Sequence, residues 1–134
     1  MGMTPTKALL LVGDDSLFRL DLKKRLETAG FAVSDAGQGQ LALSELESDP
    51  SRVSCRVTDT DMDRGPDGWE IARRARELIP NLPVVYISGH GSADWPSKGV
   101  PNSLTLSKPF ATAQLITAIS TLQVEADAHR AREG

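Results

Sequence analysis

Four apolar runs in this chain each end in a side chain that can do chemistry. Asp59 ends Arg56–Thr58, Asp14 and Asp15 follow Ala8–Val12, Ser88 follows Pro83–Ile87, and Lys108 follows Ser103–Ser107. An aspartate can act as a nucleophile and form an acyl-phosphate. A lysine and a hydroxyl can contact the oxygens of a phosphoryl group during its transfer. The combination indicates phosphoryl transfer to or from a carboxylate.

The acids in this set predict a metal ion. Asp14, Asp15 and Asp59 would bring three carboxylates into one crevice, where like charges repel unless they are neutralised. Mg²⁺ takes oxygen ligands, keeps several waters and binds one or two carboxylates together with phosphate oxygens. We therefore expect a Mg²⁺ site beside the reactive aspartate.

Alternating strands and helices position these residues. The predicted strands are Lys7–Val12, Phe31–Val33, Val53–Asp59, Pro83–Ile87 and Leu104–Leu106. Helices are expected from about Ser16 to Ala29, at Gln40–Glu47, at Trp69–Ile79, as a short broken piece at Ala93–Lys98, and from about Thr112. Helical spacing predicts that the first helix has an apolar stripe and a solvent-facing side. The stripe comprises Leu17, Phe18, Leu20, Leu22, Leu26 and Ala29, and the solvent-facing side Arg19, Lys23, Lys24, Arg25 and Glu27. Most strands lack polar alternation, which is typical of a sheet covered on both faces. The pattern predicts a doubly wound α/β domain with one parallel sheet, whose strand ends meet at one edge.

The bulk properties suit one globular domain. The chain has 134 residues, a net charge of −3 and a single cysteine, Cys55, in a predicted buried strand. We expect a flexible start at 1–6, a domain at 7–122, and a helix extension or polar tail at 123–134 that frays beyond Val124. The charge disfavours direct binding of nucleic acid. No apolar run could span a membrane and no signal peptide is present, so the expected location is cytoplasmic, with no membrane partner.

Four motifs resemble those of response-regulator receiver domains, in the family's order and over residues 7–122. They are Val12-Gly13-Asp14-Asp15, Val57-Thr58-Asp59 with Pro66-Asp67-Gly68-Trp69-Glu70 downstream, Val84-Val85-Tyr86-Ile87-Ser88-Gly89, and Leu106-Ser107-Lys108-Pro109-Phe110. The resemblance implies a flavodoxin-like (βα)₅ fold.

The resemblance also implies a function and a role for each site residue. A histidine kinase or phosphotransfer protein would phosphorylate Asp59 with Mg²⁺, and the domain would act as a two-component switch rather than an enzyme. Asp14 and Asp15 match the family's acid pair, Ser88 its switch hydroxyl and Lys108 its phosphoryl-contacting lysine. The backbone carbonyl of Asp61 would complete the metal site. Output would pass through contacts with an unidentified downstream protein, and a homodimer is possible.

Several alternatives stay open. Asp61 competes with Asp59 as acceptor, although a strand that ends at Thr58 favours Asp59. Asp14 or Asp15 could simply cap the following helix. Thr105 stands where the family normally has an aromatic residue that swings inward, so the chain could be an interaction module that works without phosphorylation. Finally, the glycine pattern Gly37–Ala42 matches a dinucleotide fingerprint, but it follows the second predicted strand rather than the first.

Overall fold

The computed structural model describes residues 8–48, 53–60, 68–88 and 99–133. Within them, five strands form one sheet in the order β2-β1-β3-β4-β5. The strands are β1 (Ala8–Val12), β2 (Val33–Ala36), β3 (Val53–Asp59), β4 (Val84–Ser88) and β5 (Leu104–Ser107), and every neighbouring pair is parallel. This order is that of the flavodoxin-like doubly wound fold. The predicted fold class is confirmed.

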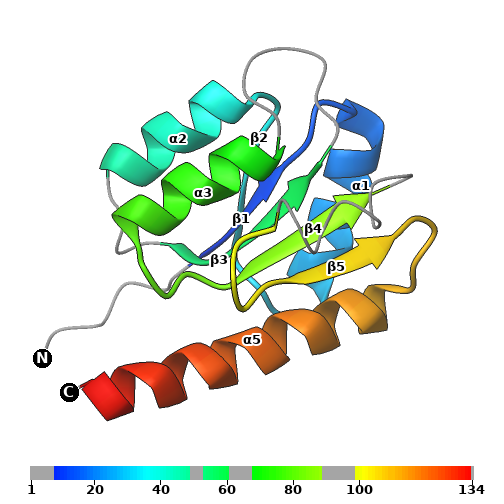
Figure 1. The fold of residues 1–134 in the computed structure, drawn as a ribbon. Coiled ribbons are helices and arrows are strands. Elements are labelled where there is room, and N and C mark those ends of the chain that lie inside the picture. Colours follow the sequence, from blue (N-terminus) through cyan, green and yellow to red (C-terminus); the bar gives the residue numbers. More distant parts are fainter. Residues whose placement is uncertain (1–7, 49–52, 61–67, 89–98, 134) are drawn as a thin grey trace, which may run out of the picture.

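Helices cover both faces of the sheet (Figure 1). The described helices are α1 (Ser16–Thr28), α2 (Gly39–Ser48), α3 (Gly68–Leu78) and α5 (Thr112–Glu133). α2 and α3 lie side by side on one face, and α1 and α5 cover the other (Figure 1). The short helix predicted at Ala93–Lys98 lies outside the described residues.

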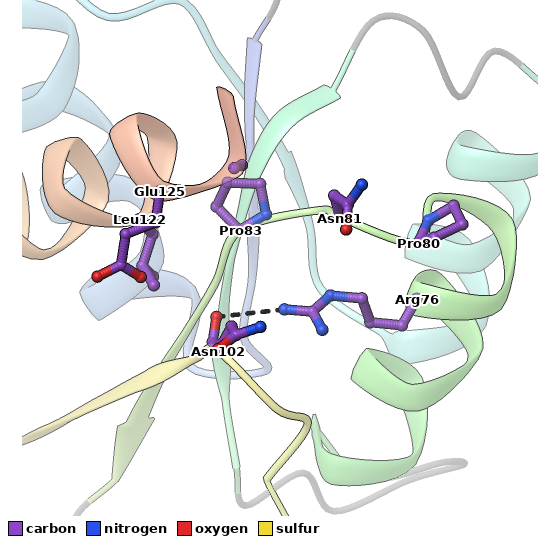
Figure 2. Close-up of a pocket in the computed structure, with 8 residues that line it drawn as sticks. Arg76, Pro80, Asn81, Pro83, Asn102, Leu122 and Glu125 are labelled. Carbon is purple, nitrogen blue, oxygen red and sulfur yellow. Dashed lines mark hydrogen bonds between the residues drawn. The ribbon is translucent and has the colours of Figure 1, made fainter. Parts of the chain in front are cut away.

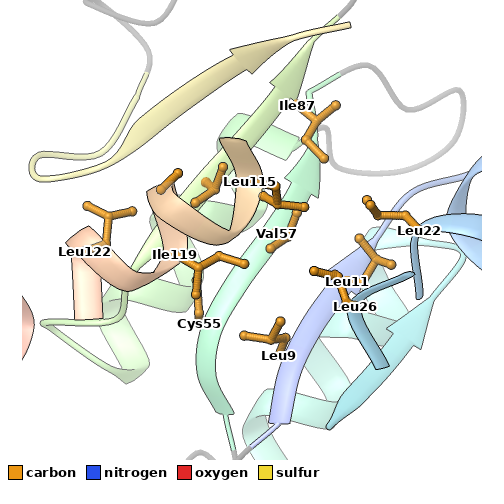
Figure 3. Packing of buried hydrophobic residues seen from close by; sticks show 12 residues of the cluster. Leu9, Leu11, Leu22, Leu26, Cys55, Val57, Ile87, Leu115, Ile119 and Leu122 are labelled. Atoms are coloured by element: carbon orange, nitrogen blue, oxygen red, sulfur yellow. The ribbon is translucent and has the colours of Figure 1, made fainter. Parts of the chain in front are cut away.

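Alternate residues of each central strand enter the two cores, which explains the unbroken apolar runs. Leu9 and Leu11 pack with the helices α1 and α5, while Leu10 and Val12 pack with α2 and α3. Figure 3 shows the first of these cores, between α5, β3, β1 and α1. Cys55 lies fully buried there, and its burial raises the thiol pKa to about 12, which fits a structural rather than a reactive cysteine.

The predicted position of β2 was wrong by two residues at its start. Gly30 ends the α1 turn with φ = 104°, and the backbone N–H of Phe31 still donates to the carbonyl of Leu26 at 3.1 Å. Gly30 and Phe31 therefore complete the helix cap. The strand cannot begin until this cap is finished, so it runs from Val33 to Ala36 instead of Phe31 to Val33.

The prediction that the chain frays beyond Val124 was also wrong, because α5 continues to Glu133. Ala126 is still buried, and with Leu122 and Glu125 it lines a cleft of about 290 Å³ (Figure 2). The opposite wall holds Arg76, which donates to the Leu82 carbonyl at 2.8 Å and to the Asn102 carbonyl at 3.2 Å. The part of α5 around Glu125 and Ala126 thus packs at the amino ends of β4 and β5, the end of the sheet opposite Asp59. Residues 123–133 are thus part of α5.

Candidate functional site

Asp59 and Lys108 meet at the carboxyl edge of the sheet. Asp59 is the last residue of the central strand β3 and is 8% exposed. The Nζ atom of Lys108 lies 3.2 Å from Oδ2 of Asp59, although the two residues are 49 positions apart in sequence. A buried carboxylate therefore already has a cation beside it, as phosphoryl transfer to Asp59 requires.

Ser88 belongs to the same edge. It ends β4, is fully buried, and pairs in register with Ser107 of β5. Its carbonyl accepts a hydrogen bond of 2.9 Å from the backbone N–H of Lys108. That bond fixes the start of the loop that carries the lysine, so the predicted acceptor, hydroxyl and lysine come from the adjacent strand ends β3, β4 and β5.

The acid pair lies at the same edge, with its side chains exposed. Asp15 is the N-cap of α1, and its Oδ1 accepts from the backbone N–H of Phe18 at 3.1 Å. The capping alternative for Asp15 is therefore correct. Asp15 also lines one small crevice together with Gly13 and Asp59, so the cap does not remove it from the site.

The Mg²⁺ site stays a prediction. Among the residues that the structure describes, no three His, Cys, Asp or Glu side chains are grouped to hold a metal ion. Asp61, whose carbonyl would complete the ligand set, lies outside those residues. The residue types nevertheless suit a hard cation, because two carboxylate-bearing residues, Asp15 and Asp59, line the same crevice.

Gly68 explains how the chain packs behind Asp59. A Cβ atom at this position would lie 2.0 Å from the carbonyl oxygen of Asp59, so only glycine allows α3 to begin here. The Gly68 N–H also points to the Thr60 carbonyl, at 3.4 Å. The first residue of α3 thus packs directly against the backbone at the end of β3.

Sequence reasoning missed Arg19 as a support of the acid loop. Helical spacing predicts that Arg19 faces solvent. In the structure, its Nη1 donates to the Gly13 carbonyl at 2.6 Å and its Nε donates to Asp35 at 2.8 Å. Lys23 adds a 3.0 Å ion pair to Asp35. Burial opposes ionisation of Asp35, but the hydrogen bonds from Lys23 and Arg19 outweigh it and hold the Asp35 pKa below its ordinary value. No pattern of residue types marks a contact between an arginine and a loop carbonyl.

The first turn of α1 also departs from the predicted apolar stripe. Leu22 and Leu26 are buried, but Leu17 is 82% exposed and Leu20 is 53% exposed. Phe18 is half-buried, and Lys108 Nζ lies 4.3 Å from the centre of its ring. We assigned Phe18 only to the core. Helical spacing could not show that this turn borders the lysine.

Thr105 stands at the position where the family normally has an aromatic residue, and the neighbouring strand supplies an aromatic side chain instead. Thr105 lies in β5, beside Tyr86 of β4, and among the described residues its hydroxyl has no hydrogen-bond partner. The Tyr86 ring packs 4.5 Å from that of Trp69, and its hydroxyl accepts from the Val100 N–H at 3.0 Å. The aromatic of this region is thus a buried tyrosine on the neighbouring strand.

The position of the glycine pattern in the sheet argues against a dinucleotide site at Gly37–Ala42. The glycine pattern follows β2, which is an edge strand, whereas the order of the sheet reverses between β1 and β3. Ligands of open α/β sheets bind at that reversal. Asp14, Asp15 and Asp59 lie there, and Gly37–Ala42 does not.

The matching family model is described as the response regulator receiver domain, and it covers residues 9–120. The chain belongs to the response regulator receiver family. It is 35% identical over 122 residues to the response regulator receiver protein CpdR of Brucella abortus, covering 90% of this chain and 99% of CpdR. It is 31% identical over 121 residues to the sensor protein EvgS of Escherichia coli, covering 88% of this chain but 10% of EvgS.

A solved structure of the family supports the same assignment. The receiver protein from Sinorhizobium medicae has a TM-score of 0.86 and 44% identity, covering 90% of this chain and 97% of the other. The receiver domain is therefore a two-component signalling module. No helix in the described part of the chain is long and apolar enough to cross a membrane.

Proposed function

We propose that this receiver domain is a phosphorylation-dependent switch in which Asp59 accepts a phosphoryl group from a histidine kinase or a phosphotransfer protein. The part-buried ion pair between Asp59 and Lys108, at the end of the central strand, is the observation that carries the proposal. Asp59 is also the better acceptor by position, because it ends β3 in the crevice that Asp15 lines.

The chemistry follows from the charges around Asp59. A carboxylate oxygen attacks the phosphorus of a phosphohistidine, the P–N bond breaks, and the imidazole leaves with its electron pair. Lys108 stabilises the charge on one phosphoryl oxygen, and the Ser88 hydroxyl donates to another. Mg²⁺, held by Asp14, Asp15, Asp59 and the Asp61 carbonyl, would neutralise phosphoryl charge.

A protein donor fits the surface beside the crevice. Leu17 and Leu20 expose apolar side chains on α1, the helix whose N-cap is Asp15. Exposed apolar groups next to a reactive centre are typical of contact with another protein. The similarity to part of a sensor protein supports a place in the same kind of pathway. Output then passes through protein contacts that the phosphoryl group biases between two states.

Incubation with acetyl phosphate and Mg²⁺, read by intact mass, tests the proposal. The parent should gain one phosphoryl group and Asp59→Asn should gain none. Asp21→Asn, a change to an exposed acid on α1, is the matched control and should behave as the parent. Phosphorylation of Asp59→Asn would instead assign the acceptor to another residue, with Asp61 tested next.

Thr105 supports the second candidate, an interaction module that acts without phosphorylation. A threonine cannot repeat the packing change of a large aromatic ring. A parent that takes no phosphoryl group, but binds the same protein partner before and after treatment with the donor, would favour this candidate.

A further inference from the structure

We propose that Phe18 is a positioning residue that holds the ammonium group of Lys108 against the acceptor carboxylate; its effect on phosphorylation rests on the function proposed above. Two groups of the described residues lie beside the ammonium. Its Nζ atom is 3.2 Å from Asp59 Oδ2 and 4.3 Å from the centre of the Phe18 ring. The second distance lies within the range of a cation–π interaction.

Lys108 needs a second restraint because its stem is long and its surroundings are open. The lysine side chain is 31% exposed. A groove of about 460 Å³ opens beside it, lined by Phe18, Phe110 and the start of α5, and offers the ammonium a path away from Asp59. A lysine side chain has a flexible four-carbon stem and loses considerable rotamer freedom when its ammonium group is fixed in one place. The ring face lowers this cost by attracting the cation toward the acceptor.

The ring restrains the ammonium without using its hydrogen-bond donors. A lysine ammonium has three N–H groups. The π face attracts the charge as a whole, so those donors stay available for Asp59 and for phosphoryl oxygens. The attraction also does not depend on the charge of Asp59, and it therefore persists when the carboxylate becomes an acyl-phosphate.

The Phe18 ring is itself fixed from two sides. The backbone N–H of Phe18 donates to Asp15 Oδ1 at 3.1 Å, which holds the residue that carries the ring. Its ring meets that of Phe110 edge-on, with centres 6.2 Å apart and planes at 82°. Phe110 follows Lys108 by two residues, so both sides of the contact are anchored near the site. Asp15, Phe18, Lys108 and Asp59 form a chain of contacts that joins the acid pair to the lysine.

The test compares Phe18→Leu with Phe18→Tyr and with Phe31→Leu. Tyrosine keeps the π face. Phe31 packs against the same core but, among the described residues, makes no cation–π contact with Lys108. The first readout needs no phosphorylation: the upfield shift of the Lys108 ε-methylene protons and the order of its Cε in NMR spectra. Both should fall in Phe18→Leu and persist in the other two variants.

The second readout is the initial rate of phosphorylation by acetyl phosphate at saturating Mg²⁺. We expect a fall of about two- to fivefold in Phe18→Leu, as an exposed cation–π contact would give, and parent-like rates in Phe18→Tyr and Phe31→Leu. Loss of Lys108 order with an unchanged rate overturns the positioning role, and so does an unchanged NMR shift. If the parent takes no phosphoryl group, the function proposed above fails, and the NMR readout alone decides whether the ring holds the lysine.

Fluorinated phenylalanines at position 18 extend the test if Phe18→Leu does not fold. One and then three ring fluorines weaken the π face with little change of shape. Lys108 order and the phosphorylation rate should fall in that sequence, while the same fluorination at Phe31 should leave both unchanged. Equal values for all rings at position 18 would show that the contact is packing alone and would overturn the proposal.

Discussion

Replacing Gly68 by alanine should push the first residue of α3 away from β3. The new Cβ would lie 2.0 Å from the Asp59 carbonyl oxygen, 2.9 Å from its carbonyl carbon and 2.9 Å from Thr60 Cα. Ordinary contact begins at 3.4 Å, so helix and strand must separate by about 1.4 Å (3.4 minus 2.0). All three atoms are backbone, and no side chain can rotate to make room.

Two opposing effects set the size of the change. Forcing extra volume into a packed region costs about 1–3 kcal/mol, and more where backbone must move. Alanine is better than glycine inside a helix by at most about 1 kcal/mol, and Gly68 is only the first helical residue. The clash therefore prevails, and we expect a net loss of about 1–2 kcal/mol or more. For a domain of this size, each kcal/mol lowers Tm by about 3–5 °C.

Thermal and urea unfolding of Gly68→Ala measure this loss, with Gly13→Ala as the control. A Cβ at Gly13 would lie 3.8 Å from Asp59 Cβ, an ordinary contact on another side of the same residue. Its stability should stay within about 0.5 kcal/mol of the parent. A Gly68→Ala protein as stable as the parent would refute the view that this close approach is required.

Three further predictions follow from buried or paired polar groups. Asp35→Asn should lower the free energy of unfolding at neutral pH and make that free energy depend less on pH in acid. The pKa of Asp35 in the folded protein lies below its unfolded value of about 4, so the carboxylate stabilises the fold above about pH 4 and this stabilisation disappears as the pH falls through the folded pKa. Urea unfolding at several pH values measures both effects. Tyr86→Phe should cost about 1–3 kcal/mol in urea unfolding, because the buried Val100 N–H loses its acceptor. Arg56→Met should raise the urea midpoint with an unchanged m-value, because it removes a fully buried guanidinium whose nitrogens have no hydrogen-bond partner in the described part of the chain.

The positions of the site residues could be predicted because parallel strands share an edge. Each apolar run predicted a strand, and the residue at its carboxyl end had to lie near its counterparts. Asp59, Ser88 and Lys108 therefore lie at the same edge, as expected. This holds even though the predicted position of the second strand was wrong, because Gly30 and Phe31 belong to the helix cap. An error of two residues at an edge strand does not move the ends of the central strands.

What the sequence could not show is the direction of individual side chains. Helical spacing puts Phe18 and Leu22 on one face of α1, but it does not reveal that the first turn extends past the sheet to the lysine. The same spacing placed Leu17 and Leu20 in the apolar stripe, whereas both side chains are exposed to solvent. It also placed Arg19 in water, whereas that side chain crosses to the carbonyl before the acid pair. These outcomes depend on how far α1 is displaced along the sheet.

Arg56 shows most clearly where pattern reasoning fails. A central strand covered on both faces buries every residue of its middle, whatever its type, and Arg56 pairs with Leu10 of β1 on one side and Val84 of β4 on the other. Burial lowers the pKa of its guanidinium to about 9, in keeping with the cost of holding a charge there. The apolar run predicted the strand correctly because its neighbours outweigh one arginine. The same run did not reveal that the Arg56 charge is buried, since hydrophobic periodicity indicates the burial of a whole strand and not the solvation of each residue in it. A stability measurement on Arg56→Met therefore measures directly how much unfavourable desolvation the strand tolerates three residues before Asp59.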